Sequence, residues 1–243
     1  MHAEVQSRER DADPPPYLLQ AYWWAYVHPR AVRVFERQWL VNLILWGNYR
    51  RLRDAAIDAL GGRLRGRTLQ ISCVYGDLTC RLAAKLAWGA QLHVVDVLRI
   101  QLDNLARKLP AGLPCMRGPG GSPQPGVRLF QGDSASLDLR SGSYDRALLF
   151  FLLHEQPAPV RRDTLAEALR IVRPGGRIVI VDYHRPRRVH PLYWTMKAVF
   201  RLLEPFALDF WNEDLALSMR TRAATVEKRT FFGGLYQLVT ITV

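Results

Sequence analysis

Two apolar runs that end in acidic residues are the first features of this 243-residue chain that indicate chemistry. The run 68–79, TLQISCVYGDLT, passes from apolar residues into Gly76 and Asp77, and a helical pattern follows directly. Twenty residues beyond Gly76, the run LHVVDV at 92–97 contains Asp96 near its end. A strand, a tight turn, a helix and a second strand ending in a carboxylate are typical of a nucleotide site, in which the carboxylate binds ribose hydroxyls. The sequence therefore predicts a nucleotide-type cofactor site with Asp96 at the ribose.

The turn of this site departs from the usual glycine pattern. Where such turns carry G-x-G-x-G, this chain has Ser72, Val74 and Gly76, and Tyr75 lies inside the turn. Larger residues leave less room for a cofactor to lie against backbone N–H groups. We therefore expect altered contacts between the turn and the nearest end of the cofactor.

Further titratable side chains follow the predicted strands, at the edge where open α/β sheets bind ligands. The candidates for acid–base catalysis are Tyr75, Asp133, His154 and Glu155. Asp182 and His184 offer a carboxylate and an imidazole, which are suitable ligands for a divalent metal ion. Two alternatives stay open: His154 caps a strand end, and Asp182 bonds to a backbone turn.

The periodicity of apolar residues predicts the elements that position these side chains. Beyond the strand that begins at Thr68, strands are expected over 91–97, 127–130, 144–153 and 177–182, with a terminal hairpin that pairs 225–230 with 235–243. Helices are expected over 78–88, 99–109 and 160–172, and a helical lid over 184–220. Ten of the seventeen residues in 110–126 are proline or glycine, which predicts an irregular loop. Alternating strands and helices indicate an α/β fold.

The N-terminal part of the chain has a different composition. Residues 1–16 are polar and end in three prolines, so we expect a disordered arm. Residues 17–62 are rich in aromatics and predict a helical cap, with one helix from Pro29 to about Trp46 and a second over 49–60. Tyr22, Trp23 and Trp24 are consecutive, so they cannot all face one core. Three roles therefore stay open for these side chains: packing in the core, binding of an aromatic substrate, and contact with a membrane interface. The candidate substrate-binding residues are Tyr22, Trp23, Trp24, His28 and Trp46.

Charge, cysteine content and hydropathy argue against several classes of protein. The net charge of +12 comes almost entirely from arginine, but no nucleic-acid motif surrounds the arginines, so compositional drift or an anionic membrane surface explains it better. Three cysteines without a C-x-x-C pair give no disulfide framework. No apolar run approaches the ~20 residues of a membrane span, and residues 1–16 lack the apolar region of a signal peptide. We expect a cytoplasmic protein.

Several motifs, taken in register, resemble one superfamily. Five strand–helix units and a terminal hairpin over about residues 60–243 resemble the class I S-adenosylmethionine (SAM) methyltransferase fold, here a seven-stranded, mostly parallel Rossmann-like sheet within a domain at 63–243. GDLT at 76–79 is similar to the turn of ubiquinone and menaquinone C-methyltransferases, and ALRIVRPGGRIVIVD and FFGGLY also fit. The resemblance implies SAM as cofactor. The cofactor-binding residues that it implies are Ser72, Tyr75, Gly76, Asp77, Thr79, Asp96, Val97, Asp133, Ser134 and Phe150.

A narrower resemblance rests on YWWAYVHP, LILWGNY, CVYGDLT, LLFFLLHEQP and LLEPFALDFW. These segments resemble the methyltransferase-like family of rhodoquinone biosynthesis. The resemblance implies conversion of ubiquinone to rhodoquinone by exchange of a ring methoxy group for an amino group. It also implies SAM as the amino donor, and a divalent metal such as Mn²⁺.

The residues agree with a reaction at nitrogen. Gln70 replaces the acid that commonly supports the methionyl amino group of SAM, and the larger residues of the turn also favour a repositioned amine. Displacement of methoxide from a quinone needs a neutral amine, a polarised carbonyl and a proton for the leaving oxygen.

Two other functions stay open. One is a conventional quinone or phenol C- or O-methyltransferase. The other is a non-catalytic SAM-fold binding module, which the presence of both Asp96 and Asp133 disfavours. The expected partners are ubiquinone and an anionic membrane surface, with peripheral association at the inner membrane and no nucleic acid.

Overall fold

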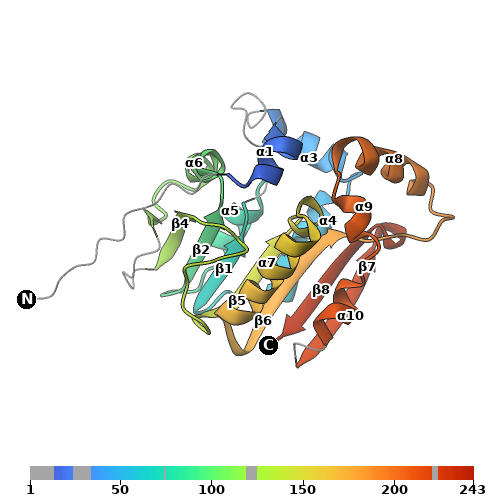
Figure 1. Cartoon of the computed structure of the whole chain (residues 1–243). Helices are drawn as coiled ribbons and strands as arrows, with labels where there is room; N and C mark the ends of the chain where they lie inside the picture. The colour runs from blue at the N-terminus through green and yellow to red at the C-terminus, as the bar shows by residue number, and fades with distance from the viewer. Residues whose placement is uncertain (1–13, 24–33, 74, 119–124, 221–223) are drawn as a thin grey trace, which may run out of the picture.

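The computed structural model of the chain describes residues 14–23, 34–73, 75–118, 125–220 and 224–243. These residues form one eight-stranded sheet with the order β3-β4-β2-β1-β5-β6-β8-β7. Helices cover both faces of the sheet, and further helices lie across one end of it (Figure 1). The predicted α/β fold is confirmed.

The middle of the sheet consists of parallel strands. Their order is β4 (Gly126–Gln131), β2 (Gln91–Asp96), β1 (Arg67–Ile71), β5 (Tyr144–Phe150) and β6 (Val172–Tyr183). Every residue of β2 is buried. This explains why its sequence does not alternate between apolar and polar residues, as the sequence of a half-exposed strand would. Because parallel strands end at the same edge, the side chains that follow β1, β2, β4 and β5 meet there.

The predicted C-terminal hairpin is also confirmed. Strand β8 (Tyr236–Thr242) pairs antiparallel with β6, and β7 (Thr225–Phe231) pairs antiparallel with β8 at the edge of the sheet. The sheet nevertheless has eight strands and not the expected seven. The additional strand is β3 (Cys115–Arg117), which pairs parallel with β4 inside the segment predicted to be an irregular loop. Three residues between prolines and glycines are too few to give a periodic signal.

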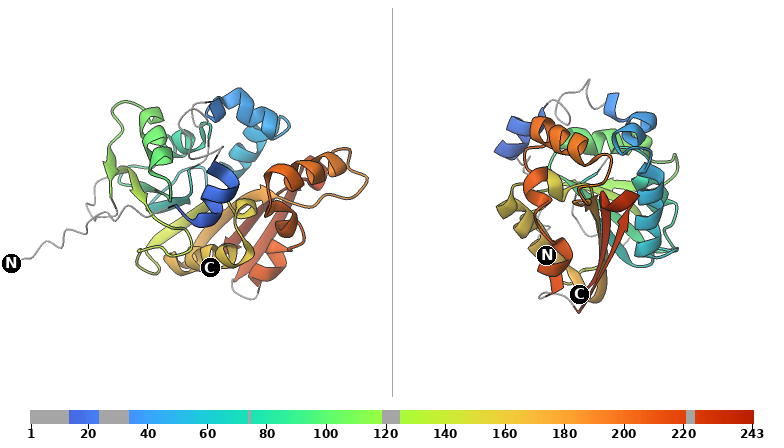
Figure 2. Two further views of the ribbon diagram at one scale, coloured as in Figure 1. Left: turned by 45° about the horizontal axis from the view of Figure 1, so that its top comes forward. Right: turned by 90° about the vertical axis from the view of Figure 1, so that its right-hand side faces the viewer.

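Two hydrophobic cores lie on the two faces of the sheet (Figure 2). Helices α4 (Tyr49–Leu60), α5 (Leu78–Ala83) and α6 (Arg99–Lys108) pack on one face with Leu148 and Phe150 of β5. Helices α7 (Ala158–Ile171) and α10 (Leu215–Arg220) pack on the other with Ala147 and Leu149. Alternate residues of β5 thus enter different cores, as the pleat of a strand requires.

The helices across the carboxyl edge come from distant parts of the sequence. They are α1 (Pro16–Tyr22), α3 (Gln38–Ile44), α8 (Tyr193–Leu203) and α9 (Ala207–Phe210). Of the helices in the predicted lid over 184–220, α8 and α9 lie across this edge, whereas α10 packs on a face of the sheet and is not part of a lid. In the described part of the chain, no helix is both long and apolar enough to cross a membrane.

Three sequence-based boundaries are wrong. The helix expected from Pro29 to Trp46 is interrupted, because Arg37 has an extended backbone with ψ of 114° before α3 begins; its start lies outside the described residues. Helix α5 ends at Ala83 and not at residue 88. Strand β5 ends at Phe150, and a short 3₁₀ helix, η2 (Leu153–Glu155), follows where the strand was expected to continue.

Candidate active site

A cavity of about 620 Å³ lies over the carboxyl ends of β1, β2, β4 and β5. The residues after those strands form its floor, and side chains of α1, α3 and α8 line it from above. Aromatic rings from distant segments contribute to its wall, among them Tyr22, Phe35, Phe151 and Phe200. Its position is the one in which open α/β sheets bind ligands.

The cavity is acidic although the chain is strongly basic. Asp96, Asp133, Glu155 and Glu204 line it together with His154, and none of the described lining residues is lysine or arginine. The chain as a whole carries a formal charge of +12. An acidic cavity in a cationic protein favours a ligand that carries positive charge.

Asp96 stands at the end of β2 and organises the first turn. One carboxylate oxygen accepts hydrogen bonds from the backbone N–H of Cys73 at 2.8 Å and from the Ser72 hydroxyl at 3.2 Å. The other accepts the Leu98 N–H at 2.8 Å. Burial raises the pKa of Asp96, and the N–H groups of Cys73 and Leu98 partly offset that rise. Asp96 therefore fixes the turn as well as lining the cavity.

Ser72 adopts a backbone conformation that favours glycine. Its φ is +69°, in the left-handed region, where most side chains are disfavoured. This is the first position of the expected G-x-G-x-G pattern, so the backbone at this position adopts a conformation that glycine favours although the glycine is absent. The hydrogen bond from the Ser72 hydroxyl to Asp96 helps to hold this conformation.

A polar cluster follows β4. One oxygen of Asp133 accepts the N–H of Ala135 at 2.9 Å. The Ser134 hydroxyl bonds to Thr164 of α7 at 2.9 Å and accepts a hydrogen bond from the Gln156 amide, also at 2.9 Å. The side-chain oxygen of Gln156 is buried and has no hydrogen-bond partner among the described residues. It is therefore an available acceptor beside the cavity, and sequence reasoning did not identify it.

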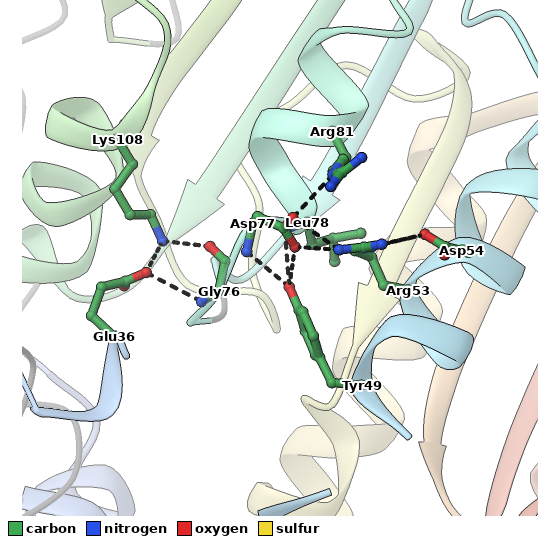
Figure 3. Close-up of polar contacts among 9 residues, drawn as sticks. All are labelled: Glu36, Tyr49, Arg53, Asp54, Gly76, Asp77, Leu78, Arg81 and Lys108. Atoms are coloured by element: carbon green, nitrogen blue, oxygen red, sulfur yellow. Dashed lines mark hydrogen bonds and ion pairs between the residues drawn. The ribbon is translucent and has the colours of Figure 1, made fainter. Parts of the chain in front are cut away.

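Three predicted cofactor residues do not line the cavity. Figure 3 shows the Asp77 side chain among Tyr49, Arg53 and Arg81. The carboxylate of Asp77 contacts Arg53 at 2.8 Å and Arg81 at 3.0 Å, and these hydrogen bonds hold its pKa low although burial alone would raise it. Thr79 donates from its hydroxyl to Gln70 at 3.0 Å. Gly76, Asp77 and Thr79 are not among the cavity-lining residues. The expectation that they contact the cofactor stays a prediction.

The backbone N–H groups of the turn are already occupied. The hydroxyl of Tyr49 accepts the N–H of Asp77 at 2.9 Å and of Leu78 at 3.1 Å, and it donates to the Asp77 carboxylate. A β-carbon on Gly76, whose φ is +92°, would overlap the Tyr49 ring, so glycine is required there. The N-terminus of α5 is therefore capped by a phenol and is not open to an anionic ligand.

A segment before α3 covers the outer side of the same turn. Glu36 accepts hydrogen bonds from the Gly76 N–H at 3.2 Å and from Lys108 at 2.6 Å (Figure 3). It also accepts a hydrogen bond from Asn104 at 2.6 Å. Next to it, the ring of Phe35 stacks on Tyr75 with 5.9 Å between ring centroids. We call Glu36, Lys108, Asn104 and Gly76 the turn clamp. Sequence reasoning missed it because its members are about 30 to 70 residues apart.

Tyr75 lies in the wall of the cavity, as its position in the turn predicted. Its hydroxyl accepts a hydrogen bond from Gln101 of α6 at 3.0 Å. Burial raises the pKa of Tyr75 above its ordinary value, so the side chain is a neutral phenol near neutral pH. It can donate or accept a hydrogen bond but is a poor base.

His154 and Asp182 form a buried pair beside the cavity. The imidazole Nδ1 lies 2.7 Å from one oxygen of Asp182, and the other oxygen accepts the N–H of Leu153 at 2.9 Å. Burial alone would lower the pKa of His154, but the nearby carboxylates, above all Asp182, raise it to about 9. His154 is therefore an imidazolium at neutral pH, and its ring lines the cavity.

The predicted metal site at Asp182 and His184 is not formed. The Asp182 carboxylate is fully buried and used by His154 and by backbone N–H groups, including that of Tyr183 at 2.7 Å. His184 bonds through Nδ1 to the carbonyl of Gly234. No group of three or more His, Cys, Asp or Glu side chains suited to a metal ion occurs among the described residues. Asp182 instead satisfies a backbone turn, which was one of the open alternatives.

Arg161 positions the turn that carries His154, Glu155 and Gln156. This arginine of α7 is only 1% exposed, and it donates to the carbonyls of Leu153 at 3.0 Å and Gln156 at 2.9 Å. It also pairs with Glu213 and lies over the ring of Phe210. Sequence reasoning predicted a helix over 160–172 but did not single out Arg161.

Glu204 is the acidic lining residue that the sequence did not single out. It follows α8 directly and is largely buried, which raises its pKa, while the charge of His154 lowers it in part. The single acid inside the apolar run LLEPFAL at 202–208 was the signal that could have identified it.

The predicted aromatic substrate residues occupy different places. Tyr22 is 1% exposed and lines the cavity, and so does Trp46, whose indole N–H donates to the sulfur of Met196 at 3.2 Å. Trp23 is half exposed and is not among the lining residues. Trp24 and His28 lie outside the described residues. The cofactor candidates Val97 and Phe150 also line the cavity.

Sequence comparison indicates a methyltransferase. Residues 68–176 match the model of the methyltransferase domain family. The ubiquinone/menaquinone biosynthesis C-methyltransferase of Paracoccus denitrificans is 28% identical over 160 residues, which are 65% of this chain and 58% of that protein. The 2-phytyl-1,4-naphthoquinone methyltransferase of Trichormus variabilis is 25% identical over 58% of this chain and 56% of its own length. The chain thus spans little more than half the length of these curated relatives.

Structural comparison gives the same fold. The phosphoethanolamine N-methyltransferase 2 of Haemonchus contortus, solved in complex with SAM, has a TM-score of 0.64 at 12% identity and covers 95% of this chain and 60% of its own. An O-methyltransferase family protein from Burkholderia thailandensis has a TM-score of 0.60 at 16% identity and covers 88% of this chain and 59% of its own. At such identities the likeness shows the fold alone. The fold is therefore that of class I SAM-dependent methyltransferases, and residues 68–176 are similar in sequence to the methyltransferase domain family.

Proposed function

We propose that this chain is a SAM-dependent enzyme that converts ubiquinone to rhodoquinone by replacing a ring methoxy group with an amino group. The observation that carries the proposal is the cavity itself. It joins a cofactor end at Asp96 and Asp133 to an aromatic end that contains a buried imidazolium, His154. A volume of about 620 Å³ is within the range for small-molecule sites.

The residues at the cofactor end fit SAM. Its sulfonium and ammonium groups give the molecule net positive charge, which suits a cavity lined by four carboxylates and no described lysine or arginine. Asp96 would hold the ribose hydroxyls. The unpaired side-chain oxygen of Gln156, beside Ser134, would accept a hydrogen bond from the adenine amino group.

The aromatic end suits a quinone ring. Tyr22, Phe151 and Tyr183 provide flat apolar surfaces, and His154 presents a charged N–H donor among them. A hydrogen bond from an imidazolium to a quinone oxygen polarises the ring toward attack, and it strengthens as negative charge develops on that oxygen. His154 would thus act as the electrophilic group, oriented by Asp182.

The turn favours transfer of nitrogen over transfer of methyl. When bound, SAM would supply the transferred amino nitrogen. The N–H groups of Gly76, Asp77 and Leu78 are already used by Glu36 and Tyr49, so they are not available to anchor the methionyl end. Tyr75 also occupies space that a glycine-rich turn leaves open. Together these contacts would shift the amino group from the place where a methyl-transfer site holds it.

Conventional methyl transfer to a quinone is the second candidate. It is favoured by the curated relatives, whose names describe quinone methyltransferases. We assign no step to a metal ion, because the described residues provide no suitable ligand cluster.

A direct test is to incubate purified protein with SAM and a short-tailed ubiquinone and to identify both products by mass spectrometry. The proposal expects an aminoquinone and methanol in equal amounts. A quinone or quinol with an added methyl group, and no methanol, would instead establish the conventional reaction.

We also propose that the substrate enters from an anionic membrane surface. The apolar side chains of α3 and α8 that flank the cavity are exposed, among them Leu43 at 62%, Trp194 at 64% and Leu202 at 81%. Lys197 and Arg201 lie on α8 among these residues, and Lys197 stands over the ring of Trp194. Exposed apolar rings and cations beside an apolar cavity suit a lipid headgroup layer.

A further inference from the structure

Glu204 has the chemical features of a proton acceptor in the cavity. Its carboxylate projects from the residue that follows α8 and lines the cavity. One of its oxygens, Oε2, is buried and has no hydrogen-bond partner among the described residues. A buried unpaired carboxylate oxygen is costly to maintain, so its presence beside a cavity points to a ligand group that would complete it.

The groups that face Glu204 come from three other elements. His154 of η2 contributes positive charge, the Tyr22 phenol of α1 favours the charged carboxylate, and Asp182 of β6 contributes negative charge. Burial is the largest influence and raises the pKa of Glu204, whereas His154 and Tyr22 lower it. A carboxylate with a raised pKa is a better base than an exposed glutamate near neutral pH.

Glu155 is the other carboxylate near His154, but its geometry differs. Its oxygen lies 3.9 Å from the imidazole Nε2, and its side chain belongs to the same short 3₁₀ helix as His154. Glu204 comes from a different element, as the residue that follows α8, and lines the cavity near His154. It can therefore contact a ligand that His154 also contacts.

We infer that Glu204 accepts the proton that the attacking atom must lose and then returns a proton to the leaving oxygen. This inference rests on the proposed function, in which the attacking atom is the amino nitrogen of SAM and the leaving group is methoxide. Glu204 is then a catalytic residue and not only a part of the cavity wall.

The proton balance of the step closes without another reactant. Glu204 takes one proton from the ammonium group and becomes neutral. The freed electron pair forms a bond to the ring carbon that carries the methoxy group, and electrons move to the carbonyl oxygen held by His154. When the carbon–methoxy bond breaks, Glu204 gives its proton to methoxide, and methanol leaves. The second proton lost by nitrogen goes to solvent, and nothing is oxidised or reduced in this step. Its product is a quinone joined through nitrogen to the α-carbon of SAM. Release of the aminoquinone requires a separate cleavage of that carbon–nitrogen bond, for which water supplies the hydroxyl to carbon and the proton to nitrogen.

The test compares Glu204→Gln with wild type, with Glu204→Asp and with Glu227→Gln as a matched control on the exposed edge strand β7. Turnover of a short-tailed ubiquinone is measured across the pH range, SAM affinity by calorimetry and folding by circular dichroism. We expect Glu204→Gln to fold and to bind SAM within about threefold of wild type but to lose about a hundredfold or more in kcat. The acidic limb of its kcat profile should disappear, and Glu204→Asp should recover part of the rate.

Two results would overturn the inference. One is a Glu204→Gln rate within about threefold of wild type, and the other is a rate lowered by the same factor at every pH, since loss of a structural contact has that effect. The transferred group is identified in wild type alone. If it is methyl, the proposed function is wrong, and the ratio of wild-type to Glu204→Gln rates for methyl transfer still decides whether Glu204 accepts the proton.

Discussion

Ser72 is the residue at which the altered turn can be tested most simply. Its left-handed backbone costs about 1 kcal/mol relative to glycine, and its hydroxyl bond to Asp96 returns a similar amount. Ser72→Gly should therefore change the free energy of unfolding by less than about 0.5 kcal/mol. Ser72→Ala keeps the strain and loses the hydrogen bond, so it should destabilise the protein by about 1 kcal/mol. Urea unfolding of both variants measures the difference, and equal stabilities would show that Ser72 is not left-handed in solution.

The His154–Asp182 pair predicts how stability depends on pH. The pKa of His154 is raised to about 9 in the folded protein, from about 6.5 in an unfolded chain. The free energy by which the pair stabilises the folded state is therefore fully present below about pH 6.5 and is lost as the pH rises through about 9. The stability advantage of wild type over His154→Gln should fall by about 3 kcal/mol between pH 6 and pH 10. An advantage that grows with pH over this range, measured by urea unfolding, would mean that the imidazole is neutral in the folded state.

Some residues of the site could be predicted from the sequence, and others could not. Asp96, Asp133, Tyr75 and His154 were predicted because each follows an apolar run, and all four line the cavity. Glu204 was not predicted, because it lies in a lid and no local sequence pattern shows that this lid crosses the sheet. Asp182 was predicted as a metal ligand, since the sequence cannot show that backbone N–H groups already occupy its carboxylate.

At the scale of elements, the turn clamp joins the segment before α3 to the cofactor turn and α6. Glu36→Ala removes three hydrogen bonds made by a side chain that is about one-fifth exposed. The variant should therefore be less stable than wild type by about 1–2 kcal/mol. It should also weaken SAM binding several-fold, because Phe35 and Tyr75 would lose their fixed position in the cavity wall.

Urea unfolding and calorimetry test this prediction, with Glu227→Ala on β7 as the control. The control removes an equally charged residue at an exposed position. If the two variants behave alike, the clamp does not hold the turn.

Periodicity predicted one helix of the N-terminal cap correctly and the other incorrectly. Helix α4 begins at Tyr49 and ends at Leu60 as expected, because the glycine pair that follows stops it and Gly61 has a φ of +111°. The aromatic run before it has helical spacing across residues 32–46, yet the chain is extended at Arg37 so that Glu36 and Phe35 can reach the turn. Tertiary contacts overrode the local pattern there.

At the scale of the molecule, the cavity mouth and the exposed face of α3 and α8 predict membrane association. Wild type should bind anionic vesicles at low salt and release them as salt rises, since each cation contributes about 1 kcal/mol that salt screens. The double variant Leu43→Glu/Leu202→Glu should bind at least about tenfold more weakly.

Trp88→Glu is the control for vesicle binding. Trp88 is 97% exposed but precedes β2, at the edge of the sheet opposite the cavity. Sedimentation with vesicles should show wild-type binding for this variant. Equal loss of binding in the control and the double variant would indicate charge alone and not the face beside the cavity.

The central claim concerns the atom that leaves SAM, and isotopic labelling measures it most directly. SAM labelled with heavy nitrogen in its amino group and heavy carbon in its methyl group is supplied in one reaction with unlabelled short-tailed ubiquinone. The account predicts a quinone product that carries the heavy nitrogen, lacks the heavy carbon and has lost one methoxy group. A product that carries the heavy carbon and no heavy nitrogen would contradict it.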